Sequence, residues 1–311
     1  MITRRRLLLG ATTAGALAVG GCGGSSPSRL TIAAGDEAGI YIAFARRLAT
    51  RLEDRVDGLR VEVLSTEGTF ENIEQLRSGR ADVALGLADG VQRDRADREE
   101  AAPWALARTY ENYLQLVVRS AGPVHSVADL TGRSISLGAA GSGAALTGAV
   151  MLDAAGLSPG AHIQHSPLSA ALDAVVHGAL DALLWSGGIP TPAISAAAAS
   201  GRVLQMIALD GVVPRMRDVS AFDYEILRVP DVGYGPASLG GTVGVANLLL
   251  CRPALSSWLA RQIVLTLVQD ARQLIPPFAQ GRQYLSPPTM IQTGTVPLHP
   301  GAVDAYRTLH E

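Results

Sequence analysis

Lysine is absent from this sequence of 311 residues. A phosphate-binding P-loop requires a lysine, and pyridoxal chemistry requires a lysine that forms a Schiff base, so both kinds of site are excluded. Cysteine is nearly absent as well, because only Cys22 and Cys251 occur. Two cysteines do not make a disulfide framework, and the apolar run around Cys251 predicts a small residue of the core.

A surplus of positive charge is also missing. Without its first 21 residues the chain has 23 basic and 28 acidic residues, a net charge of −5, and it contains no basic block. This mild acidity argues against a nucleic-acid partner. We find no cluster of residues at metal-ligand spacing and no nucleophile–base pair, so we expect no metal, no cofactor and no catalytic residue.

The N-terminus has the layout of an export signal. Three arginines precede an apolar run over residues 7–19, which is shorter than the roughly 20 residues of a membrane-spanning helix. Residues 19–22 (VGGC) resemble the lipobox of bacterial lipoproteins, in which cleavage leaves Cys22 as the acylated first residue. Residues 3–8 (TRRRLL) also resemble the twin-arginine export motif, and the alternative of an ordinary signal stays open.

We therefore expect an exported protein that a lipid, such as palmitate, anchors to the outer face of the cell membrane. Residues 1–21 would be the signal peptide, and residues 22–29 would be the lipidated tether, which is flexible because it is rich in glycine and serine. Two or more acyl chains hold a protein firmly on a membrane.

The remaining sequence alternates apolar runs with helical patterns. Three runs between residues 30 and 87 predict strands, and the spacing between them predicts helices, as in a parallel sheet covered on both faces. After a strand at residues 113–118 the pattern starts again. Residues 172–183 then repeat residues 73–84, each with a helix, a glycine that stops it, an aspartate and a buried strand.

The repeat predicts two related α/β lobes. The long apolar run at residues 242–251 would carry the chain back to the first lobe, followed by helices at residues 253–274 and 300–309. The first lobe would comprise residues 30–117 and 244–311, and the second residues 118–243. Two lobes joined by crossing strands form a binding protein with a hinged cleft.

Three glycine-rich loops are candidates for holding a ligand, at residues 35–39, 65–72 and 138–144. Each follows a predicted strand and precedes a helix, where free backbone N–H groups and the helix dipole favour a carboxylate. Such turns are also ordinary in α/β proteins. Because two loops belong to the first lobe and one to the second, they could face each other across the cleft.

The sequence resembles the TAXI group of solute-binding proteins, the receptors of TRAP-type transporters. The resemblance covers nearly the whole chain after the tether, and its most specific segments are PTPAI and VPLHPG. The matching stretches are residues 33–49 (AAGDEAGIYIAFARRLA), 65–86 (STEGTFENIEQLRSGRADVALG), 137–157 (LGAAGSGAALTGAVMLDAAGL), 180–194 (LDALLWSGGIPTPAI) and 296–306 (VPLHPGAVDAY). The resemblance implies a two-lobed, periplasmic-binding-protein-like fold of type II. Such a protein closes on a small carboxylate or amino acid, such as glutamate, and delivers it to a membrane permease.

On this basis we predict a ligand site between the lobes. The backbone of Gly143 and Ala144 would bind a carboxylate, and Tyr41 would pack against the body of the ligand. The predicted residues are Tyr41, Thr66, Asn72 and Asp89 from the first lobe, and Ser142, Gly143, Ala144, Ser186 and Gly187 from the second. Trp185 is expected in the core, with a place in the cleft as the alternative.

The sequence departs from the family where the ligand would bind. Residues 39–43 are GIYIA instead of the usual GTYYP, residues 87–89 are LAD instead of QSD, and Ala144 replaces a threonine. These changes remove groups that could hydrogen-bond a ligand, while Asp36 and Glu37 add acid. A less polar ligand, or one with a cationic group, therefore stays open.

Two other functions stay open beside the receptor. The first is an exported sensor or scaffold that has the same fold but no transporter. The second is an exported enzyme, which we disfavour because the sequence shows no catalytic pair.

Overall fold

A computed structural model describes residues 29–99, 102–201, 204–231, 234 and 240–310. The predicted signal peptide, Cys22 and all of the tether except Arg29 lie outside these residues. Within the described ranges, no helix has the length and apolar character needed to cross a bilayer.

Ten strands form one mixed sheet with the order β2-β1-β3-β10-β4-β7-β5-β6, in which β8 also pairs with β4 and β9 with β10. The strands are β1 (Arg29–Ala33), β2 (Arg60–Leu64), β3 (Val83–Leu87), β4 (Trp104–Arg119), β5 (Ser134–Ser136), β6 (His162–Gln164), β7 (Ala182–Gly187), β8 (Leu204–Ile207), β9 (Glu225–Arg228) and β10 (Gly241–Cys251). β1–β3 are parallel to one another, as are β5–β7, whereas β4 and β10 run antiparallel to their neighbours.

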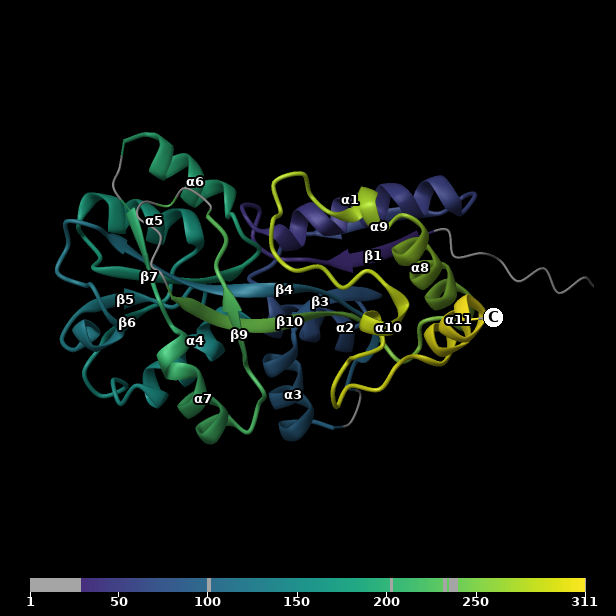
Figure 1. The fold of residues 1–311 in the computed structure, drawn as a ribbon. Coiled ribbons are helices and arrows are strands. Elements are labelled where there is room, and N and C mark those ends of the chain that lie inside the picture. The colour runs from purple at the N-terminus through teal and green to yellow at the C-terminus, as the bar shows by residue number, and fades with distance from the viewer. Residues whose placement is uncertain (1–28, 100–101, 202–203, 232–233, 235–239, 311) are drawn as a thin grey trace, which may run out of the picture.

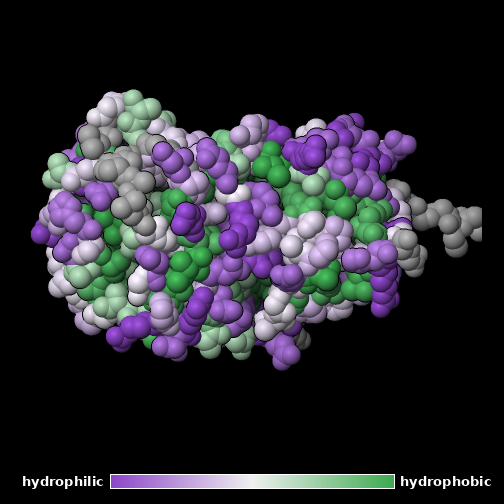
Figure 2. Space-filling view, viewed as in Figure 1, coloured by the Kyte–Doolittle hydropathy of each residue, from purple (hydrophilic) through white to green (hydrophobic). Residues whose placement is uncertain are grey.

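Helices cover both faces of the sheet, with α1, α5 and α6 above it and α3, α4 and α7 below it in Figure 1. The helices are α1 (Ile40–Arg55), α2 (Thr69–Arg77), α3 (Ala88–Asp97), α4 (Gly143–Ala154), α5 (Leu168–His177), α6 (Pro192–Ala199), α7 (Val213–Ser220), α8 (Ser257–Gln269), α9 (Ala271–Leu274), α10 (Pro287–Met290) and α11 (Pro300–His310), with 3-10 turns at Val127–Leu130 and Asp210–Val212. Hydrophilic and apolar residues are interspersed over this face of the molecule (Figure 2).

The structure has two halves, which meet at the crossing strands β4 and β10. The first half contains β1–β3 with α1–α3 and α8–α11, and the second contains β5–β9 with α4–α7. Separate apolar clusters fill them, one around Phe44 and Leu48 and others around Leu152 and Val175.

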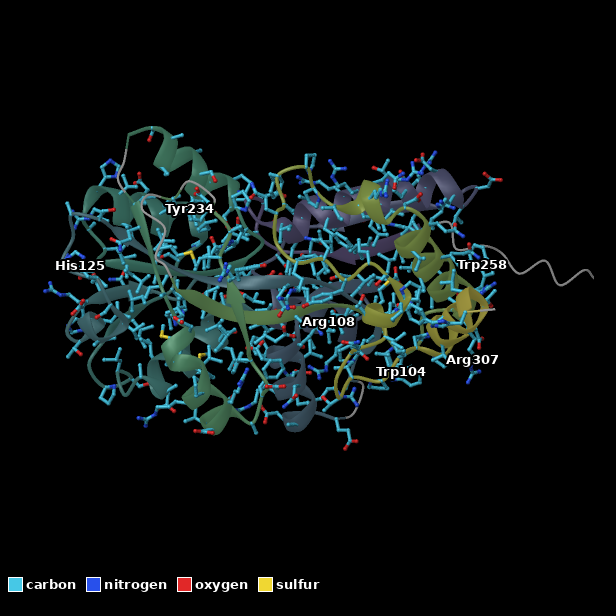
Figure 3. The ribbon with its side chains drawn as sticks, viewed as in Figure 1. Trp104, Arg108, His125, Tyr234, Trp258 and Arg307 are labelled. Atoms are coloured by element: carbon cyan, nitrogen blue, oxygen red, sulfur yellow. The ribbon has the colours of Figure 1, made fainter. Side chains whose placement is uncertain are left out.

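Arg108 of β4 lies between Trp104 in the first half and Tyr234 in the second (Figure 3). Its guanidinium bonds Glu111 at 3.0 Å and Glu225 at 2.9 Å. The pair between Arg108 and Glu225 links the crossing strand β4 to β9 of the second half.

The predicted internal repeat occupies equivalent places in the two halves. Gly79 and Gly178, with φ of +70° and +80°, follow α2 and α5, and this left-handed backbone suits glycine. Asp82 accepts a hydrogen bond from the Thr31 backbone N–H at 2.9 Å, and Asp181 accepts one from Ser134 at 3.0 Å. Each aspartate therefore binds the neighbouring parallel strand of its own half.

Two predictions about individual elements need correction. The strand expected at residues 113–118 begins at Trp104, because polar residues of its first part hydrogen-bond neighbouring strands, Arg108 to Glu225 of β9 and Thr109 to the Asn247 carbonyl of β10. The helix expected at residues 253–274 begins after Ser256, whose hydroxyl caps the Leu259 N–H, and is interrupted at Asp270.

Helix α3 contains charged residues that are not all exposed to solvent. Asp94 is buried there and pairs with Arg77 at 2.8 Å, since α3 packs against α2. The prediction for Cys251 is confirmed, because its side chain is fully buried and unpaired, and burial raises the pKa of its thiol to about 12.

Candidate functional site

The three predicted ligand loops meet at one cavity, between the N-termini of α1, α2 and α4 and the end of β7. Its free volume is about 50 Å³, above the roughly 10–15 Å³ that a cavity needs to hold one water molecule. The cavity is lined by Gly35, Asp36, Gly39, Ile40, Tyr41, Glu67, Gly68, Thr69, Leu87, Asn112, Ser142, Gly143, Ala144, Trp185, Ser186 and Gly187. Six of the nine predicted ligand residues are among them.

Backbone N–H groups at the three helix starts are the main positive feature of the cavity. Gly39 and Gly68 precede α1 and α2, and neither helix has a side-chain cap. At α4 the Ser142 hydroxyl caps the N–H of Ala145 at 3.1 Å. The N–H groups of Gly143 and Ala144 precede that cap and have no partner within the helix itself. Each helix start adds a partial positive charge of roughly +0.5.

The two halves touch directly beside this cavity. The backbone N–H of Phe70, in α2, donates to the carbonyl of Gly141 at 3.2 Å. A Cβ atom on Gly143 would lie 2.6 Å from both Leu87 and Thr69 of the other half. Glycine at position 143 is therefore a condition for this close approach.

Two aromatic residues, Tyr41 and Trp185, form part of the wall. A Cβ atom on Gly39 would lie 3.5 Å from Trp185, so the Trp185 ring packs closely against the loop before α1. Trp185 thus lies at the cavity, in accordance with the alternative stated for it. The Tyr41 hydroxyl is buried without a well-oriented hydrogen bond in the described structure. Burial raises the pKa of Tyr41 well above its usual value, and the Thr69 side chain opposes part of that shift.

Asn112 is a cavity residue that the sequence did not indicate. It lies on β4, and its side-chain amide donates to the Ser186 hydroxyl at 3.3 Å. Asn247 of β10 donates to the Asn112 carbonyl oxygen at 2.6 Å. Hydrogen bonds thus connect polar side chains of both crossing strands to Ser186 at the cavity. The available signal was a polar residue within an apolar strand, and it was missed because the predicted strand began at Tyr113.

The charged groups of the cavity are acidic. Asp36 and Glu67 are among the lining residues, and Asp36 also accepts the Ala38 backbone N–H at 2.8 Å. Glu37, in contrast, pairs with Arg46 at 2.8 Å on the exposed face of α1. Among the described residues that line the cavity, none is an arginine or histidine. An anionic group would therefore depend on backbone N–H groups, whereas a cationic group could meet carboxylates.

Thr66 and Asn72, which were predicted to bind ligand, are not among the lining residues. Asn72 is fully buried, and its amide donates to the carbonyls of Ala34 and Leu85. The Thr66 hydroxyl donates to Asn72 at 2.7 Å. In this structure both residues fix the loop that leads into α2, and a ligand role for either stays a prediction.

Asp89 also lies away from the cavity lining. Its carboxylate is 4% exposed and accepts hydrogen bonds from Thr147 at 2.6 Å, Tyr224 at 3.1 Å and the Gly90 N–H at 2.7 Å. Both side-chain donors belong to the second half. The described residues contain no group of three or more histidine, cysteine, aspartate or glutamate side chains that could hold a metal ion.

Solved binding proteins share this fold. The periplasmic binding protein BugD matches with a TM-score of 0.57 at 14% identity, over 81% of this chain and 85% of its own. A substrate-binding protein of an ABC uptake transporter from Streptococcus pneumoniae, with bound histidine, gives 0.53 at 15% identity, over 79% and 87%. The alkanesulfonate-binding protein SsuA from Xanthomonas axonopodis pv. citri, bound to MOPS, gives 0.52 at 17% identity, over 91% and 84%.

These likenesses confirm the predicted α/β, periplasmic-binding-protein-like fold, and the two-lobed type II arrangement is consistent with them. The sequence itself belongs to the NMT1-like family, whose profile matches residues 32–308.

Proposed function

We propose that this protein is an extracytoplasmic solute receptor that closes two lobes on a small carboxylate or amino acid. The observation that carries the proposal is the cavity at which three helix N-termini from both halves meet. Together with the family and the fold, this arrangement supports capture of a ligand rather than chemistry on it. The lobes proposed are residues 30–117 with 244–311, and residues 118–243.

The charges favour a small zwitterion over a simple anion. A ligand carboxylate would accept hydrogen bonds from the N–H groups of Gly143 and Ala144. An ammonium group would lie near the carboxylates of Asp36 and Glu67 and could contact the Trp185 ring, since cations are attracted to aromatic faces.

The proposed partner is a TRAP-type permease, on the grounds of the sequence resemblance in PTPAI and VPLHPG. Lipid attachment at Cys22 belongs to the same proposal, because an anchor would keep the receptor beside its permease. Uptake of a radiolabelled ligand by cells that make this chain together with a candidate TRAP permease tests the partnership. Uptake restored by an ABC permease instead would contradict it.

A thermal-shift screen of the full chain tests the binding site. We expect glycine, L-alanine or L-serine to raise the melting temperature, because a ligand at 100 times its Kd stabilises a protein by about 2.7 kcal/mol. Gly143→Ala should remove this shift, since the added methyl group would overlap Leu87 and Thr69. Gly211→Ala is the matched control, because a Cβ there meets nothing within 4 Å. A shift that persists in Gly143→Ala would place the ligand elsewhere.

The two other functions give different results in simple assays. An enzyme would change its ligand, whereas a receptor returns it unaltered after release. A sensor without a transporter would bind the ligand with no effect on uptake. Mass spectrometry of the released ligand separates the enzyme from the receptor.

A further inference from the structure

The Asp89 carboxylate is one of the most completely buried charged groups at the contact between the halves. It projects from the first turn of α3, in the first half. Its two side-chain partners come from the second half, Thr147 from α4 and Tyr224 from the segment between α7 and β9. Asp89 therefore lies on the boundary that a hinge motion of the lobes would open.

Other contacts show that this boundary is continuous with the ligand cavity. Phe70 bonds Gly141 beside the cavity, and Gln92 of α3 donates to the Ala221 carbonyl at 3.4 Å on the far side of Asp89. Leu87, two residues before Asp89, lines the cavity itself. Closure around a ligand and burial of Asp89 thus involve the same two surfaces.

The partners of Asp89 are all neutral hydrogen-bond donors. Burial raises the pKa of the Asp89 carboxyl, and the hydrogen bonds from Thr147, Gly90 and Tyr224 oppose this shift. A carboxylate transferred from water to such a place loses hydration that neutral donors replace only in part. Protonation of Asp89 removes its charge and therefore most of this loss of hydration free energy.

The other ionisable groups nearby do not neutralise Asp89. Arg93 and Asp153 line a groove that Asp89 and Tyr224 also line, but Arg93 pairs with Asp97 at 3.0 Å. The negative charge of Asp89 also raises the pKa of Tyr41, which lines the cavity. His165, which contacts the Gly138 carbonyl at 3.2 Å, is a further ionisable group near the start of α4.

We infer that Asp89 is a positioning residue that latches the two lobes in the closed state, and that closure of the lobes takes up a proton at this carboxylate. The inference rests on the proposed receptor function, because it requires a cleft that opens. In the open state Asp89 faces water and ionises at its usual pKa. Ligand binding should therefore be tighter at low pH.

The dissociation constant measures this linkage. It should rise up to tenfold for each pH unit between the usual aspartate pKa and the raised value of the closed state, and should be constant above that window. Asp89→Asn keeps the shape but removes the charge, so binding should be independent of pH. Glycine is the probe for this measurement, because its own net charge does not change between pH 5 and pH 8.

Small-angle X-ray scattering of the full chain provides a readout that needs no ligand. The wild-type radius of gyration should be smaller at pH 5 than at pH 8, whereas Asp89→Asn should be compact at both. Asp153→Asn, in the same groove, should keep the wild-type pH dependence. His165 is unchanged in all three proteins, so the comparison assigns the effect to Asp89.

The two donors supply a second set of variants. Tyr224→Phe and Thr147→Val should each weaken glycine binding at pH 7 by roughly twofold to tenfold, the usual effect of losing a hydrogen bond between uncharged groups, because Asp89 is protonated in the closed state. Thr147→Ser retains the hydroxyl and should restore binding.

A wild-type radius that is equal at pH 5 and pH 8, or a pH dependence that survives in Asp89→Asn, overturns the latch. Glycine binding with a constant affinity across this range would reject the latch and leave the receptor intact. Compaction at low pH without glycine binding would support the latch and contradict the proposed ligand.

Discussion

Replacing Asn72 with alanine separates a structural role of this residue from a ligand-binding one. Asn72 is fully buried at the start of α2 and holds together three parts of the first half. Its amide donates to the carbonyls of Ala34, after β1, and of Leu85, in β3, and its carbonyl accepts from Thr66. Alanine leaves all three of these polar groups without their partner.

The expected loss follows from those contacts. A buried polar group that loses its partner raises the free energy of the folded state by about 1–3 kcal/mol, and a small cavity adds to this. Because the local structure relaxes in part, we expect Asn72→Ala to lower the free energy of unfolding by about 3–5 kcal/mol. This is a large share of the roughly 5–15 kcal/mol that stabilise a typical protein.

Urea denaturation followed by circular dichroism measures this change. Gln75→Ala is the control, because Gln75 lies on the same helix and hydrogen-bonds only side chains near the surface, among them Glu71. Its effect should be below about 0.5 kcal/mol. If Asn72→Ala unfolds at the wild-type urea concentration but no longer responds to glycine, the structural reasoning is wrong and Asn72 binds ligand.

Two further variants test the packing and the ion pairs of the first half. Gly301→Ala should lower the free energy of unfolding by about 3 kcal/mol, because its Cβ would lie 2.1 Å from the Ser257 carbonyl oxygen and force α11 away from α8. The control Gly211→Ala should stay within about 1 kcal/mol of the wild type. Equal urea midpoints for the two variants would contradict this prediction. Hydrogen bonds from Arg55 hold the pKa of Asp270 at about 2. This pair should therefore stabilise the fold above the usual aspartate pKa, and the contribution should be lost as the pH falls toward 2. Asp270→Asn should remove about 1–2 kcal/mol at pH 7 and less at pH 3, as measured by urea denaturation at both values.

The most specific segments of the family resemblance serve the fold in this structure. In VPLHPG, His299 accepts the Gly301 N–H at 3.1 Å and contacts the Leu255 carbonyl at 3.0 Å, which fixes the start of α11 against α8. In PTPAI, Thr191 bonds the Gln115 side chain of β4 at 3.1 Å. Both segments therefore stabilise local contacts of the fold in this structure, and membership of the TAXI group stays a prediction.

The sequence by itself determined the alternation of strands and helices, although not every element or boundary. Alternating apolar runs, glycine stops and the repeated helix–aspartate–strand unit predicted β1–β3 of the first half and β7 of the second, because these signals depend on local geometry and on the period of the buried face. The three-residue strand β6 was not predicted. The same reasoning placed the three glycine loops at strand ends, and these loops do meet at one cavity.

Only the tertiary structure decided which polar residues face that cavity. Asn72 and Asp89 are not among the lining residues, and their predicted ligand roles stay predictions, whereas Asn112 was missed and lies at the cavity. The direction of a buried polar side chain depends on partners that are far away in the sequence, such as Thr147 for Asp89. No local pattern contains that information, because it arises when the two halves pack together.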